Sequence, residues 1–149
     1  VTFNWLENML RCLNSNSRIG LVGPMTNEGP KQQLLRKRFN NLKDMHRFAR
    51  SFNRPSNTEK WRAVDWLSGF CLLIRGKLVK KIGLLDEQFK LGLFTDNDYC
   101  FRTKKAGYKR VCAGDTYVHH FGHKTLAGNK ARRGNRVSKD RAKLRKKWD

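Results

Sequence analysis

The chain has few acidic residues and no long apolar segment. Twelve Asp and Glu residues stand against 33 Lys and Arg residues, which gives a formal net charge of +21 over 149 residues. No apolar run is long enough to span a bilayer, and no secretory signal is recognisable, so the sequence predicts no transmembrane helix. The hydrophobic fraction of 38% suffices for the core of one domain of ordinary size, although it is low for a compact enzyme.

Paired cysteine spacings and internal repeats are also missing. The four cysteines are scattered, without a C-x-x-C pair, at positions Cys12, Cys71, Cys100 and Cys112. Three of them fall among apolar neighbours, which favours buried free thiols in a reducing cytoplasm over a disulfide framework. No segment repeats at the period of a solenoid.

The positive charge is spread unevenly. Residues 124–149 carry eleven basic and two acidic residues, a net charge of +9, and the remaining +12 belongs to residues 1–123. A charge of this size implies an anionic partner, such as nucleotide phosphates, nucleic acid, anionic lipid or an acidic neighbouring domain. We therefore divide the chain into a globular part, 1–123, and a basic, partly helical tail, 124–149.

Hydrophobic periodicity predicts alternating helices and strands. Helices are expected over 4–14 (with Asn4 as its cap), over one or two stretches of 31–52, over 76–82, from Asp98 to Gly107, and over 138–148 (with Ser138 as its cap). Strands are expected over 19–24 (stopped by Pro24), over 70–74 (covered on both faces), over 109–112 and over 116–119. This alternation predicts an α/β layer with a mixed sheet flanked by helices.

Two carboxylates stand at the start of one predicted helix. Asp96 or Asp98 occupies the N-cap position before the apolar residues 99–101. Backbone N–H groups at a helix start favour an ionised carboxylate, and such a carboxylate beside a cleft can accept a proton from an attacking hydroxyl. From these residues alone, a helix cap without further function is the favoured interpretation.

Five sequence blocks together resemble the second half of a family 2 glycosyltransferase of bacterial type, which has the GT-A fold. The blocks are residues 66–75 (WLSGFCLLIR), 81–89 (KIGLLDEQF), 96–102 (DNDYCFR), 106–108 (AGY) and 119–122 (HHFG). They occur in the order and spacing of that family. Residues 1–27 also resemble the helix and strand that follow the family's metal motif.

The resemblance implies roles for individual residues. Asp96 matches the catalytic base of inverting members, and Asp98 would cap the helix or orient Asp96. The family's acidic motif is commonly Glu-Asp-x-Asp, and here Thr95 replaces its first acid. Trp66 and Gly69 match the loop at the acceptor site, where an aromatic ring can stack on a sugar.

Two further sites are implied at the end of the fold. His120 matches the family's His-x-Gly, where it would ligate a divalent metal or contact the diphosphate, although a histidine that merely packs is an equal alternative. Arg132 and Arg133 are expected to contact the diphosphate. The pattern of His119, His120 and His123 is not expected to form a zinc site.

The resemblance covers only part of the family's fold. The nucleotide-binding half, with the Asp-x-Asp that holds Mn²⁺ or Mg²⁺, has no counterpart here, and the only Asp-x-Asp is residues 96–98. We therefore expect a partial GT-A fold cut from a longer hexosyltransferase-like enzyme, inactive alone. The parent would transfer a sugar from a nucleotide-sugar donor to a glycan, lipid or protein acceptor, with inversion.

Two other functions stay open at this point. The charge supports a nucleic-acid-binding module as the alternative, but no helix-turn-helix, zinc-finger or RNA-recognition signature is present, so a nucleic-acid partner is not expected. The tail alternatively contacts anionic lipid, which would make a cytoplasmic protein peripheral at the inner membrane face, but its apolar residues are few.

Overall fold

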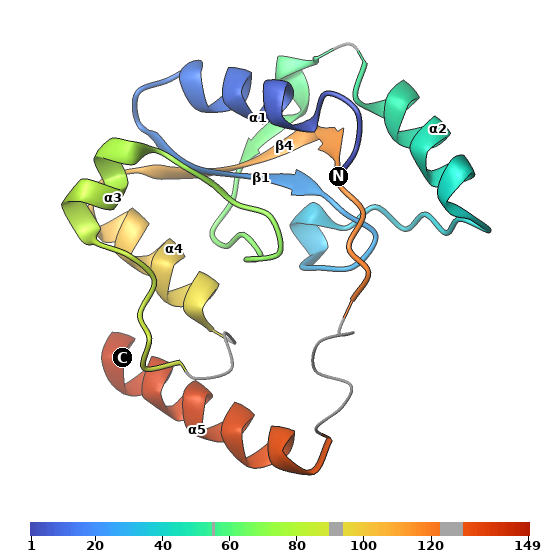
Figure 1. Ribbon diagram of the computed structural model, residues 1–149. Helices are drawn as coiled ribbons and strands as arrows, with labels where there is room; N and C mark the ends of the chain where they lie inside the picture. The colour runs from blue at the N-terminus through green and yellow to red at the C-terminus, as the bar shows by residue number, and fades with distance from the viewer. Residues whose placement is uncertain (55, 90–93, 123–129) are drawn as a thin grey trace.

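The computed structural model describes residues 1–54, 56–89, 94–122 and 130–149, and within 130–136 it describes the backbone only. It shows an α/β arrangement in which helices flank a four-stranded mixed sheet (Figure 1). The predicted fold class is thus confirmed at the level of an α/β layer with a mixed sheet.

The sheet is built around two parallel strands. β1 (Ile19–Met25) pairs in parallel with β4 (Lys109–Tyr117), and the strand order is β2-β4-β1-β3. β2 (Trp61–Ala63) and β3 (Leu73–Ile74) add antiparallel edges on either side. Both central strands are almost entirely buried, as expected for parallel strands covered on two faces.

Helices cover both faces of this sheet. α1 (Trp5–Asn14) lies on one face, and α3 (Gly76–Ile82) and α4 (Thr95–Lys105) lie on the other (Figure 1). Because successive side chains of a strand point to opposite faces, Val22 packs in the core under α1, and Leu21 packs in the core against α3 and α4.

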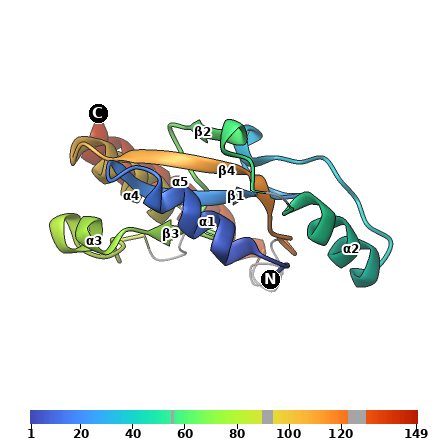
Figure 2. The same cartoon turned by 90° about the horizontal axis from the view of Figure 1, so that it is seen from above.

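The remaining helices lie further out. α2 (Leu42–Phe52) lies beyond the C-terminal ends of β1 and β4 and packs on Tyr117 (Figure 2). Two single-turn helices, η1 (Lys31–Gln33) and η2 (Thr58–Lys60), occupy the connections. α5 (Lys130–Trp148) lies outside α4, away from the sheet (Figure 1). Within the described ranges, no helix combines the length and apolarity needed to cross a bilayer.

Three predicted strand boundaries are wrong. Pro24 lies inside β1, opposite Ala113, because β3 pairs only with residues 21–22 and no strand on that side needs the missing N–H of proline. Residues 109–112 and 116–119 are not separate strands: β4 runs through Asp115, whose carboxylate accepts hydrogen bonds from Ser56 and Asn57. The strand predicted over 70–74 shortens to β3, because it forms the half-buried edge of the sheet.

Two predicted caps are also wrong. Asn4 precedes α1 in a left-handed conformation (φ 53°) and makes no side-chain capping bond. Ser138 lies within α5, because this helix already begins at Lys130. The helix predicted over 76–82 is confirmed, and it ends at Gly83, whose φ of 78° suits a residue without a Cβ atom.

Candidate functional site

Asp96 lies in the first turn of α4 rather than at its cap. Phe94 takes the capping position in a left-handed conformation (φ 68°), so the predicted N-cap role of Asp96 or Asp98 is wrong. Asp96 Oδ2 accepts a hydrogen bond from the backbone N–H of Gly69 at 2.9 Å, and Oδ1 accepts one from the N–H of Asn97 at 2.9 Å. The carboxylate is thereby fixed between α4 and the loop before β3.

Burial raises the pKa of Asp96 above its ordinary value. Desolvation disfavours the charged form, and this effect exceeds the opposing hydrogen bonds from Gly69, Asn97 and Trp66, which favour it. A carboxylate with a raised pKa is a stronger base when ionised, which suits proton abstraction near neutral pH.

Gly69 allows this close approach. A Cβ atom at position 69 would lie 3.3 Å from the Cβ of Asp96 and 3.6 Å from its Oδ2. Any larger residue would therefore press on the carboxylate that the Gly69 amide holds. The structure brings these two predicted site residues into direct contact.

Trp66 lies behind the carboxylate, half-buried against the core under α4. With the Asn97 amide oriented to satisfy both neighbours, it accepts from the Trp66 indole N–H at 3.2 Å and donates to Asp96 Oδ1 at 3.2 Å. Trp66 is not among the residues that line the pocket beside Asp96, and its indole N–H instead contacts the Asn97 amide that holds Asp96.

A pocket of about 650 Å³ opens in front of Asp96. It is framed by α1, the loop before β3, β3 itself, the start of α4 and the segment after β4. Its wall is formed by Trp5, Ser68, Gly69, Phe70, Cys71, Leu72, Ile74, Leu85, Thr95, Asp96 and His120. Four predicted site residues, Gly69, Thr95, Asp96 and His120, thus share one pocket.

Trp5 and Phe70 contribute aromatic rings to this pocket. The sequence predicted that Trp5 lies in the core or at the surface, and the structure shows it partly buried against the core under α1. That the same ring also reaches a pocket wall is not visible in a helix pattern. Phe70 stacks on the imidazole of His120, with ring centroids 4.9 Å apart and an interplanar angle of 21°.

His120 is held firmly at the pocket. Its backbone N–H donates to Asn27 Oδ1 at 2.8 Å, and its carbonyl accepts from Asn27 Nδ2 at 2.9 Å. Its Nδ1 lies 3.1 Å from the carbonyl oxygen of Glu28. Because a carbonyl only accepts, Nδ1 carries the proton in this contact, and Nε2 is left as the acceptor nitrogen.

His119 turns away from the pocket. Its Nδ1 lies 2.8 Å from the hydroxyl of Tyr117, and its ring contacts Phe39 and Phe121. The pKa of His119 is lowered, chiefly by burial and also by His120. Of the two neighbouring histidines, His120 is the one that faces the pocket.

A metal site is not assembled by the described residues. Across residues 1–54, 56–89, 94–122 and 130–149, no three His, Cys, Asp or Glu side chains converge as metal ligands. His120 supplies one ligand atom at most, whereas a divalent cation needs several. The part of the chain that the structure describes therefore does not fit a Mn²⁺ or Mg²⁺ ion by itself, and we derive no step through one.

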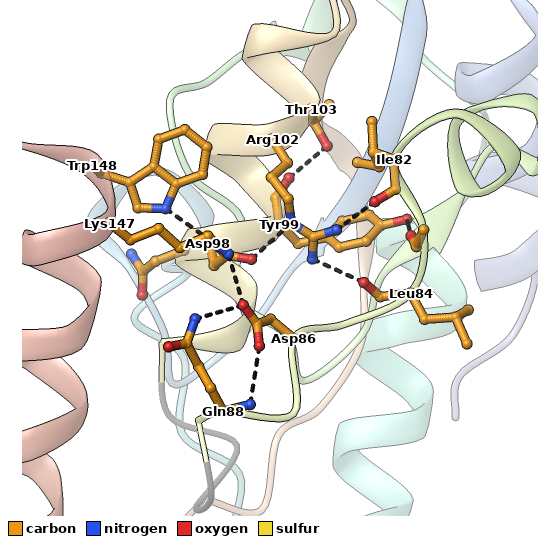
Figure 3. A network of polar contacts seen from close by, with 12 residues as sticks. Ile82, Leu84, Asp86, Gln88, Asp98, Tyr99, Arg102, Thr103, Lys147 and Trp148 are labelled. Atoms are coloured by element: carbon orange, nitrogen blue, oxygen red, sulfur yellow. Dashed lines mark hydrogen bonds and ion pairs between the residues drawn. The ribbon is translucent and has the colours of Figure 1, made fainter.

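Asp98 faces away from the pocket and is fully buried. Its Oδ2 accepts from Arg102 Nε at 2.8 Å, and its Oδ1 lies 2.7 Å from Lys147 Nζ and 2.9 Å from Trp148 Nε1 (Figure 3). Its partners therefore belong to α4 and α5, in place of the contact with Asp96 that the sequence suggested. The predicted diphosphate contacts of Arg132 and Arg133 stay a prediction, because the structure does not describe the side chains of these two residues.

Comparisons with known proteins found no relative of this chain. The chain matches no protein-family model, and neither the curated proteins nor the solved structures yield a similar protein. The function of the pocket must therefore be argued from its own residues.

Proposed function

We propose that this chain forms the acceptor side of a glycosyltransferase with a GT-A fold, and that Asp96 is its catalytic base. The observation that carries the proposal is the position of the Asp96 carboxylate, which is half-buried in a pocket wall and held by the Gly69 amide at 2.9 Å. The sequence resemblance supports it, because Gly69 and Asp96, which match parts of the acceptor and base motifs, both line this pocket.

The proposed step is a single displacement. The acceptor hydroxyl gives its proton to a carboxylate oxygen of Asp96, while its oxygen forms a bond to the anomeric carbon of the donor sugar. The bond from that carbon to the diphosphate breaks, and the nucleoside diphosphate leaves with the bonding electrons. Attack opposite the leaving group inverts the anomeric configuration.

The pocket has the chemical character of a sugar site. The rings of Trp5 and Phe70 offer apolar faces, and Ser68, Thr95, Asp96 and His120 offer polar groups within the same 650 Å³. Ligand sites commonly combine aromatic walls with a few placed polar groups. His120, with its Nε2 free to accept, is a candidate contact for an acceptor hydroxyl.

The donor site belongs, in this proposal, to a nucleotide-binding half that these 149 residues do not contain. A divalent metal in the complete enzyme would neutralise the diphosphate as it leaves. The chain alone is then expected to bind acceptor and to show no turnover. All four cysteines are free, which is compatible with the cytoplasmic location that the proposal assumes.

The proposal is tested by titrating ¹⁵N-labelled chain with methyl glycosides of common hexoses and N-acetylhexosamines. We expect the amides of Gly69 and Thr95 and the indole of Trp5 to shift with at least one sugar. The exposed residues of α2 provide an internal control and should not shift. Shifts confined to α2, or none at millimolar sugar, would contradict an acceptor site at this pocket.

A second candidate function rests on a different surface. A pocket of about 310 Å³ beside α2 is lined by Lys37, Arg38 and Arg47 together with the rings of Phe39 and Phe48. Cations next to aromatic rings suit single-stranded nucleic acid. A salt titration with a single-stranded DNA 20-mer separates the two readings: binding that persists at 200 mM salt and disappears in Arg47→Gln would favour this alternative.

A further inference from the structure

The last turn of α5 reaches the buried carboxylate of Asp98. Asp98 has no exposed surface, and two of its hydrogen-bonding partners, Lys147 and Trp148, come from α5 (Figure 3). A buried carboxylate is costly unless its oxygens are paired, so the docked position of α5 is strongly preferred over an undocked one. Asp98 lies two residues after Asp96, in the same turn of α4.

Lys143 and Lys147, one turn apart in α5, also contact the segment between α3 and α4. Lys147 Nζ lies 2.7 Å from Asp86 Oδ2 and 2.7 Å from Asp98 Oδ1, so one ammonium group joins two carboxylates. Lys143 Nζ donates to the carbonyl of Gln88 at 2.8 Å. The hydrogen bonds from Lys147 and Gln88 lower the pKa of Asp86 to about 2.

Arg102 completes the connection from within α4. Its guanidinium donates to Asp98 and also to the carbonyls of Ile82 at 2.7 Å and Leu84 at 2.9 Å (Figure 3). Asp98 therefore links α5, α4 and the segment 82–88 through paired charges and backbone carbonyls.

Aromatic contacts accompany these polar ones. The rings of Phe101 and Trp148 lie 5.3 Å apart, and the guanidinium of Arg141 lies 6.0 Å from the ring of Phe94. The indole of Trp148 thus packs on α4 with its ring and donates to Asp98 with its N–H. Both parts of the side chain serve the docked state.

The two elements that α5 contacts, α4 and the segment 82–88, both contribute to the wall of the pocket. The first turn of α4 supplies Thr95 and Asp96, and the segment 82–88 supplies Leu85. Residues 137–148, the part of α5 whose side chains the structure describes, do not line the pocket. This described part of α5 therefore bears on the pocket through the elements that carry these three residues.

We propose that α5 sets the separation of these two walls, with Lys147 and Trp148 as positioning residues for Asp96. When α5 is docked, the Lys147 ammonium holds Asp86 and Asp98 at a fixed distance, and the Gly69–Asp96 hydrogen bond forms. Loss of docking releases both walls and weakens that hydrogen bond. Naming the pocket a reaction site rests on the proposed function, but the effect of α5 on the pocket does not.

The test compares Lys147→Met with Lys146→Met. Lys146 is the neighbouring exposed residue of the same helix, so the control removes the same charge with the same helix propensity. Amide exchange at Gly69 reports the hydrogen bond to Asp96, and exchange at Val22 and Val111 reports the core of the sheet. The indole resonance of Trp148 reports whether α5 is docked.

We expect Lys147→Met to accelerate exchange at Gly69 about tenfold, as local opening does, with Val22 and Val111 unchanged. Lys146→Met should match the wild type, and Lys147→Arg should restore protection. Trp148→Phe, which keeps the ring contact and loses the N–H donor, should act in the same direction as Lys147→Met.

Unchanged protection of Gly69 in both Lys147→Met and Trp148→Phe would overturn the inference, whether or not the indole resonance shows α5 to be docked. Equal acceleration at Gly69, Val22 and Val111 would also overturn it, because that result means global destabilisation. No sugar or nucleotide enters this experiment, so its outcome is independent of the proposed function.

Discussion

The backbone N–H of Gly69 donates to the carboxylate of Asp96 at 2.9 Å, although 27 residues separate the two positions. The contact places a desolvated carboxylate at a pocket that also holds Thr95 and His120. Because the pKa of Asp96 is higher in the folded state, the ionised carboxylate lowers the free energy of unfolding. That relationship leads to the first two predictions.

Asp96→Asn is expected to raise the thermal stability of the chain at pH 7. The raised pKa means that the folded state binds a proton on Asp96 more tightly than the unfolded state does, so ionised Asp96 lowers the free energy of unfolding above its folded pKa. Asparagine keeps an acceptor oxygen for Gly69 and carries no charge. The gain should vanish below the ordinary carboxyl pKa, where Asp96 is protonated in both states.

Melting curves of both proteins between pH 3 and pH 8 check this. A stability difference that does not change with pH would contradict the desolvated state of Asp96. An Asn variant that is less stable at pH 7 would contradict it as well.

Gly69→Ala is expected to displace the Asp96 carboxylate with little loss of stability. The added methyl group meets Asp96 at 3.3 Å, so the neighbour must move by a few tenths of an ångström. We expect a stability cost below about 2 kcal/mol and a transfer rate in the complete enzyme reduced about 100-fold, as small misplacements of reacting groups produce.

Gly76→Ala is the matched control. No atom lies within 4 Å of the added Cβ atom at Gly76 in the first turn of α3, so this variant should keep its activity and gain up to about 1 kcal/mol of stability. Equal activity in the two variants would remove Gly69 from the site.

Asp98→Asn is expected to cost about 3 kcal/mol or more of unfolding free energy, because it removes the buried charge that Arg102 and Lys147 both contact. Glu87→Gln changes an exposed carboxylate of the adjacent turn and should be neutral within about 0.5 kcal/mol. Urea unfolding followed by tryptophan fluorescence measures both. A cost below about 1 kcal/mol for Asp98→Asn would show that α5 contributes little to the fold.

The thiols are expected to react slowly at neutral pH. Burial raises the pKa of Cys71, which lines the pocket, to about 11, and the other three cysteines are buried. Because the thiolate is the reactive form, the labelling rate of Cys71 should rise about tenfold per pH unit between pH 7 and pH 10. Dithionitrobenzoate labelling followed by peptide mapping checks the order: Cys71 first, and the other three only on unfolding.

The sequence was sufficient for the elements whose signals are local. The helix over 76–82 could be bounded because an apolar stripe ends at a glycine that adopts φ 78°. The central strand over residues 19–24 could be placed because a continuous apolar run marks burial on both faces. Only the family resemblance predicted that one site would contain Gly69, Thr95, Asp96 and His120, because these residues come from distant parts of the chain.

The sequence was not sufficient where tertiary contacts decide. β4 continues through Gly114 and Asp115 because Asp115 accepts hydrogen bonds from Ser56 and Asn57, which no local pattern shows. Trp148 has an ordinary place in a basic helix, and its hydrogen bond to Asp98 spans 50 residues. The sequence also did not show that Trp5 lines the pocket and Trp66 does not, because burial of one face of a helix or loop is visible in sequence and the wall of a pocket is not.

The most direct measurement is sugar transfer by the enzyme that we propose, in which this chain is combined with a nucleotide-binding half, compared between wild type and Asp96→Asn. We expect the variant to bind the nucleotide-sugar donor as well as the wild type does and to lose transfer by a factor of about 100 to 10,000, as removal of a general base does. Transfer at the wild-type rate by Asp96→Asn would contradict the assignment of Asp96 as the base.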